Sequence, residues 1–333
     1  MPDGEEPRAG IARGLLERCT FPPPGAPLTC AVSGGADSLA LLLLAVMAGC
    51  RVTAVHVDHG LRAGSAAEAE VVASAAARVG ADFRRERVEL EPGPNLEARA
   101  RAARFAVLPP DVATGHTMDD QVETVLCNLL RGTGPDGLAG MRPGPAHPLL
   151  GLRRSETRQV CEEAGIAWVD DASNRDPRYL RNRVRLELLP LCEDVAGRDP
   201  VPAIARLASL AGADGALLDG LAADLVPDPT SAAALVRAPE PLAARAVRRW
   251  LREIGATPAS GGRAARVAGA DRQPPSSADV RRVLGVAAGS AVATEIAGGW
   301  RVCRSRGRLS ASPPPSVPAR DVEGSGERPR DGH

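Results

Sequence analysis

One stretch near the N-terminus constrains the fold more than any other part of the chain. Residues 28–57 comprise an apolar strand (LTCAV), a short turn (SGGAD), an apolar helix (SLALLLLAVMAG) and a second strand rich in β-branched residues (RVTAVHV). A helix that is apolar almost all round, between strands without polar alternation, is typical of elements buried in a parallel sheet. The pattern therefore predicts a strand–helix–strand unit whose turn lies at the carboxyl end of the first strand.

The same alternation continues over roughly the first 190 residues. It predicts an α/β fold with a doubly wound, mostly parallel sheet, whose ligands bind outside the carboxyl ends of the strands. Further strands are predicted at 85–90, 111–115 and 166–170, and helices at 66–80, 95–107, 118–131 and 154–164.

After Pro190 the composition changes to stretches rich in Ala, Leu and Arg, which predict a smaller, mainly helical C-terminal domain. Helices are expected at 201–225, 240–254 and 278–285, followed by two strand-like pieces, 290–299 and 300–310, that could pair as a hairpin. The expected domains are a flexible N-terminal segment and helix at 1–24, a catalytic domain at 25–192, the C-terminal domain at 193–310 with a flexible loop at 255–277, and a disordered tail at 311–333.

Composition excludes several classes of function. The formal net charge is zero and all 41 basic residues are arginine, so no protein lysine takes part in chemistry and any polyanion site must come from local clusters of arginine. None of the seven cysteines forms a CxxC pair, which argues against a disulfide framework and against a zinc or iron–sulfur site. The N-terminus does not resemble a signal peptide, and the longest apolar run, 39–47, is too short to span a bilayer. We therefore expect a cytoplasmic protein without a membrane partner.

The turn SGGADS, residues 33–38, is suited to an anion. Gly34 and Gly35 let the backbone approach closely, the N–H groups at the start of the helix point outward, and the hydroxyls of Ser33 and Ser38 add donors. Asp37 could hold Mg²⁺ beside phosphates. The turn is neither a Walker A loop nor a GxGxxG dinucleotide loop. On its own it is equally consistent with a strand-to-helix turn capped by serine and aspartate.

Two further segments could complete such a site. HVDHGLR, residues 56–62, places two histidines at the end of the second strand, where a lone histidine is more often structural. In NLEARARAARF, residues 95–105, Arg101 and Arg104 share a helix face and could bind phosphate or the charge on a leaving group. The alternative is an ion pair of Glu97 with Arg101 on a solvated face.

The segment TGHTMDDQVET, residues 114–124, is the most informative. A strand ends in a glycine and His116, and the helix that follows carries Asp120 and Glu123 on one face. These groups could orient Mg²⁺ and a cationic amine, and an acid could accept the proton of the amine. Acidic residues in a first helical turn also complement the helix dipole, which is the alternative interpretation.

A local basic patch follows the segment WVDDASN, residues 168–174. Five arginines lie between 175 and 185, around the motif YLRNRVR, in a protein that is neutral overall. Such a patch beside a phosphate site suits a nucleic-acid backbone, although a solvated helix face has the same composition.

The motif SGGxDS resembles the PP-loop of the ATP-pyrophosphatase superfamily, whose members cleave ATP between the α and β phosphates. Together with the five segments above, over residues 28–191, it resembles the tRNA(Ile)-lysidine synthetase family. The resemblance implies use of ATP and Mg²⁺ and a substrate tRNA(Ile) with a CAU anticodon. O2 of its wobble cytidine is adenylated, and free L-lysine then displaces AMP at C2 to form lysidine. Members are often dimeric, so the resemblance also implies a homodimer.

The resemblance assigns roles to the residues that match its motifs. Two positions depart from the family pattern, Phe105 in place of tyrosine and His147 in place of a frequent arginine. The resemblance implies that the nucleotide is bound by Ser33, Gly34, Gly35, Ala36, Asp37, Ser38 and His59, and that Asp37 also binds Mg²⁺. It implies that Arg101 and Arg104 bind the adenylate or tRNA, and that His116, Asp120 and Glu123 bind lysine, Mg²⁺ or the activated base. The tRNA-binding residues that it implies are Arg181, Asn182, Arg183 and Arg185.

Three other classes of protein share some of these features. A PP-loop tRNA thiolase also adenylates a base but generally depends on cysteine pairs or an iron–sulfur cluster. A non-catalytic, nucleotide-gated RNA-binding protein would be expected to lose Asp37, Asp120 or Glu123, and all three are present. A small-molecule ligase of the amidotransferase type would have no need for the arginine patch at 175–185.

Overall fold

The computed structural model of the protein describes residues 14–58, 65–88, 99, 103, 106–169, 176–256 and 275–314. The chain divides into two compact units, and the division falls between Gly220 and Leu221, inside one long helix. The predicted domain boundary after residue 192 does not coincide with this division and stays a prediction about function. Each unit has a hydrophobic core of its own.

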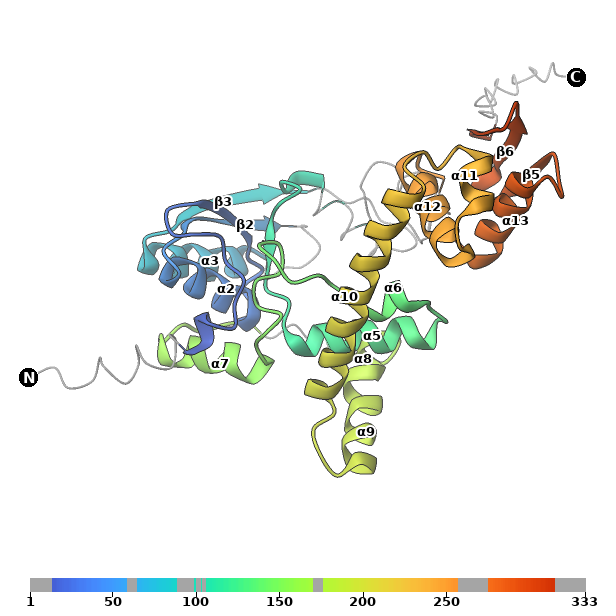
Figure 1. Ribbon diagram of the computed structural model, residues 1–333. Coiled ribbons are helices and arrows are strands. Elements are labelled where there is room, and N and C mark those ends of the chain that lie inside the picture. Colours follow the sequence, from blue (N-terminus) through green and yellow to red (C-terminus); the bar gives the residue numbers. More distant parts are fainter. Residues whose placement is uncertain are drawn as a thin grey trace, which may run out of the picture. The chain divides into compact units, whose positions relative to one another are not determined.

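A parallel sheet organises the first unit (Figure 1). Its strands are β1 (Pro27–Ala31), β2 (Arg51–Asp58), β3 (Asp82–Arg87) and β4 (Ala113–Thr114). They lie in the order β3-β2-β1-β4, and every neighbouring pair is parallel. The chain thus runs outward from β1 to β3 and returns to the opposite side of β1 for β4. The crevice at the carboxyl ends of β1 and β4 is therefore the place where such a sheet binds ligands.

Helix α2, Ala36–Met47, follows β1 directly and is buried along most of its length, as its apolar sequence predicts. It packs against the strands and against α3 and α7. The helical elements of this unit are α2, α3 (Ser65–Val79), α5 (Met118–Leu130), α6 (Pro135–Leu138), α7 (Arg154–Glu163), α8 (Leu180–Arg183), the π-helix Val184–Leu188, α9 (Leu189–Ala196) and α10 (Val201–Leu225).

Apolar side chains cover both faces of the sheet. Along β2, Val52 and Ala54 belong to the main core with α2 and α3, whereas Val55 packs with Leu108 and Val112 in a second cluster. Because successive residues of a strand point to opposite faces, this division shows that the sheet is buried on both sides. The predicted doubly wound α/β fold is confirmed.

The second unit combines helices with a small antiparallel sheet. Its core contains Trp250, Leu251, Val283 and Val302. The predicted pair of strand pieces forms three strands in the order β5-β6-β7. The elements are α11 (Ala232–Arg237), α12 (Glu240–Glu253), α13 (Ser277–Ala288), β5 (Ala293–Ile296), the 3₁₀ turn Ala297–Gly299, β6 (Trp300–Ser305) and β7 (Arg308–Ser312).

Some predicted elements are wrong or shifted. Residues 166–169 form no strand; Val169 donates one backbone hydrogen bond to Gly34 instead of joining the sheet. The strand predicted at 85–90 lies at Asp82–Arg87. Most of the predicted helix 95–107, of the loop 255–277 and of the tail 311–333 lies outside the described residues, as do residues 1–13.

Helix α10 is both longer than the apolar run at 39–47 and apolar on average. It has 25 residues, and its most apolar window has a mean hydropathy of 1.3 with 11% of the window buried. Among the described residues it is the one helix that is long and apolar enough, by length and composition, to cross a membrane. The helix predicted at 201–225 is confirmed, and its sequence contains no long uninterrupted apolar run because small and charged residues lie between its leucines.

Replacing Leu44 by alanine tests the packing of α2. Leu44 is fully buried in the main core, so we expect Leu44→Ala to lower the free energy of unfolding by about 2–5 kcal/mol. Met47 on the same helix is 48% exposed, and Met47→Ala is expected to change it by no more than about 0.5 kcal/mol. Urea unfolding of both variants measures the difference; equal effects would contradict the packing described for α2.

Candidate active site

The turn between β1 and α2 leaves backbone donors available to a ligand. Gly34 has a φ of 91°, in the left-handed region that favours glycine. Gly35 is the N-cap residue of α2, with extended backbone and no side-chain hydrogen bond to the helix. The alternative of a turn capped by serine or aspartate is therefore wrong. The N–H groups of Ala36 and Asp37, in the first turn of α2, remain for an anion, which the helix dipole also favours.

The two serines of the turn contact each other. The Ser38 hydroxyl donates to the carbonyl of Gly35 over 2.8 Å and accepts from the backbone N–H of Ser33 over 3.1 Å, and the two hydroxyl oxygens are 3.3 Å apart. Ser38 and Ala36 are buried, whereas Ser33 is exposed. Ser38 thus holds the shape of the loop.

Gly115 explains how closely the ends of β1 and β4 approach. A Cβ atom on Gly115 would lie 2.5 Å from the carbonyl oxygen of Asp37, a distance that no side chain tolerates. The segment after β4 therefore packs directly on the turn after β1. The glycine of the TGH motif is required by this contact, a reason that local sequence patterns do not reveal.

The charge of Asp37, in the first turn of α2, is partly compensated. One carboxylate oxygen accepts a hydrogen bond from the Thr157 hydroxyl, and the other lies 3.5 Å from Nε of Arg154. Burial is the largest influence and raises the pKa of Asp37, although Thr157 and Arg154 act in the opposite direction. A divalent cation beside this carboxylate would complete its compensation, so the residue fits Mg²⁺.

The described residues contain no group of three or more His, Cys, Asp or Glu side chains placed to hold a metal. Mg²⁺ is commonly bound by one or two carboxylates together with substrate phosphates and water. The surroundings of Asp37 match that arrangement better than a site built entirely from protein ligands.

Asp120 caps its helix, as the alternative interpretation predicts, and it also pairs with two arginines. It occupies the third position of α5, where one carboxylate oxygen accepts from the backbone N–H and the hydroxyl of Thr117, over 2.9 and 2.8 Å. The other oxygen accepts from Arg154 and from Arg181, each over 2.9 Å. Asp120 is thus a helix-capping residue and an ion-pair partner at once.

Glu123 is a carboxylate surrounded by arginines. Its side chain is 2% exposed, and it accepts hydrogen bonds from Arg154 over 3.1 Å and from Arg181 over 2.8 Å. Nε of Arg185 lies 4.0 Å away. Because Arg154 and Arg181 each contact both acids, Asp120 and Glu123 face the same side of α5, as their spacing predicts.

Charge pairing keeps Asp120 ionised. Burial is the largest single influence and by itself would raise the pKa of this carboxyl, but Arg154, Arg181 and the hydrogen bonds from Thr117 outweigh it and hold the pKa at about 2. The same acids raise the pKa of Arg154 in spite of its burial. The site therefore contains fixed charges of both signs at neutral pH.

The motifs in the sequence did not include Arg153 and Arg154. Arg153 donates two hydrogen bonds of 3.1 Å to Asp119 and also pairs with Asp199, and the backbone N–H of Arg154 donates to Asp119 over 2.8 Å. Both residues stand at the start of α7, where the helix dipole disfavours positive charge. Consecutive arginines at a helix N-terminus were the signal that could have identified them.

His116 is joined to His147 through Thr114. The Thr114 hydroxyl oxygen lies 2.7 Å from Nδ1 of His116 and 2.9 Å from Nδ1 of His147, and the rings are 5.2 Å apart in an edge-to-face arrangement. His147, at a position where the family pattern has a frequent arginine, therefore lies beside His116 at the end of β4.

The predicted tRNA-binding residues fall into two groups. Arg181 and Arg185 face the acid pair, whereas Arg183 is 59% exposed and pairs with Glu187 on its own segment. Asn182 donates to the carbonyl of Asp176 over 2.9 Å. A π-helix follows at once, a geometry often found at functional sites.

The other residues named from the sequence are placed as follows. His56 is buried, with Nδ1 lying 2.9 Å from the carbonyl oxygen of Val32, which agrees with a structural role. His59, Arg101 and Arg104 lie outside the described residues, so their roles stay predictions.

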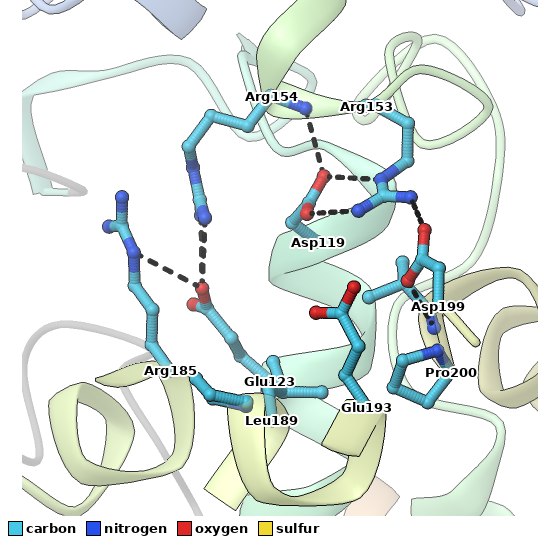
Figure 2. A pocket seen from close by; sticks show the side chains of 11 residues that line it. Asp119, Glu123, Arg153, Arg154, Arg185, Leu189, Glu193, Asp199 and Pro200 are labelled. Carbon is cyan, nitrogen blue, oxygen red and sulfur yellow. Dashed lines mark hydrogen bonds and ion pairs between the residues drawn. The ribbon is translucent and has the colours of Figure 1, made fainter. Parts of the chain in front are cut away.

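A pocket of about 240 Å³ opens beside the acid pair (Figure 2). Asp119 and Glu123 from α5, Arg153 and Arg154 at the start of α7, and Arg185 line one part of it. In Figure 2, Glu193 of α9 faces the interior without a drawn partner. The remaining lining residues are Leu189, Pro190, Asp199, Pro200 and Val201.

Replacing Asp120 by asparagine tests its pairing with Arg154 and Arg181. Because folding lowers the pKa of Asp120, its ionised form stabilises the protein above the pKa of the unfolded chain, and this contribution is lost as pH falls toward about 2. We expect Asp120→Asn to lower the free energy of unfolding by about 2 kcal/mol at pH 7, with the gap closing as pH falls below about 4.

Urea unfolding at several pH values measures this gap. Asp82→Asn removes an exposed carboxylate from β3 and serves as the control. A gap for Asp120→Asn that is independent of pH would contradict the ion pairing.

Comparison with known proteins agrees with this geometry. The family profile of the PP-loop domain matches residues 15–192. The chain is 44% identical to the tRNA(Ile)-lysidine synthase of Nocardia farcinica over 240 residues, covering 68% of this chain and 76% of the relative. It is 45% identical to the enzyme of the same name from Mycobacterium leprae over 244 residues, covering 68% and 75%. Among solved structures, it is similar to the U34-tRNA thiolase NcsA of Methanococcus maripaludis, with a TM-score of 0.48 and 15% identity over 62% of this chain and 81% of that chain.

Proposed function

This chain belongs to the tRNA(Ile)-lysidine synthase family of PP-loop proteins, and we propose that it ligates free L-lysine to C2 of the wobble cytidine of a tRNA(Ile) with a CAU anticodon. ATP activates O2 of the cytidine as its adenylate with release of pyrophosphate, and the lysine amine then displaces AMP. One observation carries the proposal: Arg154 contacts Asp37 of the PP-loop and both acids of α5. The phosphate site and the amine site therefore belong to one centre.

The PP-loop supplies the first half of the reaction. The N–H groups at the start of α2 suit the phosphates of ATP, and the positive φ of Gly34 shapes the backbone around them. Asp37 would hold Mg²⁺ there, and the cation would neutralise charge on the phosphates and on the departing pyrophosphate. Arg154 lies beside Asp37, where its guanidinium would stabilise the negative charge that develops during adenylation.

The acid pair supplies the second half. Asp120 and Glu123 are close enough together to share one guanidinium, so they can hold the ammonium group of lysine in the same way. A nucleophilic amine must first lose a proton, and these carboxylates or His116 would accept it. Asp120 also lies near His116, which helps to lower the pKa of this acid.

The arginine-rich segment after residue 175 supports an RNA substrate. Arg178 and Arg183 are exposed, and within the described part of the chain they pair with acids of their own segment, Asp176 and Glu187. Such pairs are weak and are readily exchanged for phosphate. Arginines also outnumber acidic residues in the described part of the second unit. These features suit binding of a tRNA backbone.

The cysteines argue against the thiolase alternative. Burial raises the pKa of the Cys19, Cys30 and Cys161 thiols to about 12, which keeps them protonated and unreactive. Protonated thiols are poor nucleophiles, and none of the seven cysteines forms the CxxC pair on which such enzymes generally depend.

We also propose a cytoplasmic protein that acts as a homodimer and does not insert into a membrane. Helix α10 carries Arg206, Asp214, Asp219 and Asp224. Charged residues are costly inside a bilayer, so α10 is suited to solvent or to a protein surface.

Incorporation of radiolabelled lysine into a tRNA(Ile) transcript with a CAU anticodon, with ATP and Mg²⁺, tests the function directly. We expect label in this transcript and none in the methionine tRNA that shares its anticodon. Asp37→Ala is expected to reduce incorporation by about 100-fold or more, because it removes a charge from the phosphate site. Asp111→Ala, at an exposed position before β4, is the matched control.

Release of pyrophosphate that depends on tRNA, without lysine incorporation, would contradict the proposed nucleophile. It would leave the adenylation step intact and favour a thiolase.

A further inference from the structure

The charges around the acid pair are balanced before any substrate binds. Asp37, Asp120 and Glu123 face the guanidinium groups of Arg154, Arg181 and Arg185. An ammonium group that entered this arrangement would add a positive charge in a partly buried place, which is unfavourable unless another cation leaves. Binding of a cationic amine therefore requires one arginine to move.

The three arginines are not equally held. Arg154 has a side chain that is 15% exposed, contacts all three acids and begins α7 with its own backbone N–H bonded to Asp119. Both its side chain and its backbone are therefore bound to acidic residues. Arg185 lies 4.0 Å from Glu123 and forms no close hydrogen bond with it, so its departure would free no carboxylate oxygen.

Arg181 combines a strong hold on the acids with an open side toward solvent. Its Nε donates to Glu123 over 2.8 Å and its Nη2 donates to Asp120 over 2.9 Å, yet its side chain is 42% exposed. It stands on the four-residue helix α8, which has no side-chain cap. Of the three, it is the arginine whose departure would free oxygens of both Asp120 and Glu123 without breaking the contact of Arg154 with Asp37.

We propose that Arg181 occupies the place of the lysine ammonium group between Asp120 and Glu123 and leaves when a phosphate of the bound tRNA takes its guanidinium. The inference rests on the proposed function and adds a determinant of specificity to it. Exchange of the guanidinium for an ammonium group keeps the charge of the acid pair compensated. The guanidinium meanwhile gains a phosphate, which it can bind through two parallel hydrogen bonds.

The residues around Arg181 indicate why an RNA phosphate would compete with Asp120 and Glu123 for its guanidinium. Arg178 and Arg183 flank it and are 82% and 59% exposed, so a phosphate chain that follows this segment meets Arg181 between them. Because the exchange links the two ligands, tRNA must strengthen lysine binding by the same factor as lysine strengthens tRNA binding. Lysine would then be admitted mainly to enzyme that already carries its tRNA.

The test is the affinity for L-lysine, measured by calorimetry without ATP, in the absence and presence of a saturating tRNA(Ile) transcript. We expect tRNA to tighten lysine binding to the wild-type protein about tenfold. Arg181→Gln should bind lysine about tenfold more tightly than wild type without tRNA and gain little more when tRNA is added. Arg181→Lys, which keeps the charge, should behave like wild type.

Arg84→Gln is the matched control, because it removes an equal charge from an exposed ion pair with Glu86 on β3, at the edge of the sheet opposite to β4. It should leave lysine affinity in the absence of tRNA unchanged. A merely structural role for Arg181 would weaken lysine binding in Arg181→Gln or leave it as it is, and either result would overturn the proposal. The wild-type comparison with and without tRNA decides the matter even if Arg181→Gln does not fold.

Failure of the inference and failure of the proposed function are distinguishable. Wild-type protein that incorporates labelled lysine into tRNA(Ile), but whose lysine affinity is the same with and without tRNA, would overturn only the role of Arg181. Absence of incorporation would overturn the proposed function, and the inference with it.

Discussion

The contacts of the Arg154 guanidinium are the interactions on which the rest of the site depends. They join Asp37, at the start of the helix after β1, to Asp120 and Glu123, on the helix after β4. Without this cation, three carboxylates would lie together in a region of low exposure with their like charges uncompensated. Arg154 therefore compensates the charges of acids from two helices in one site.

The order of the strands explains why these groups meet. Since β4 pairs with β1 on the side opposite to β2, the turns after β1 and β4 are neighbours in space although about eighty residues separate them in sequence. Gly115 permits the two turns to touch. A nucleotide at one turn and an amine at the other are then adjacent, as transfer through an adenylate requires.

Local patterns were sufficient to predict the sheet, α2, α5 and the acid pair, because apolar periodicity and the i, i+3 spacing are properties of short stretches. The prediction of a strand at 166–170 is wrong because an apolar run does not show whether a neighbouring strand is available for pairing. Val169 forms a backbone hydrogen bond with Gly34 of the PP-loop instead. Arg154 was missed because its partners lie more than thirty residues away in the sequence. For the same reason Arg181, expected on the RNA surface, was not predicted to face Glu123.

Separation of the two half-reactions tests most directly whether the PP-loop and the acid pair divide the chemistry as described. Wild type and Glu123→Gln are given ATP labelled at the α phosphate and tRNA(Ile), and lysine is added after the tRNA has been labelled. The account predicts that both proteins transfer the adenylyl group to tRNA, and that lysine releases labelled AMP rapidly from wild type and slowly from Glu123→Gln. Release at equal rates from the two proteins would contradict the assignment of the acid pair to the amine.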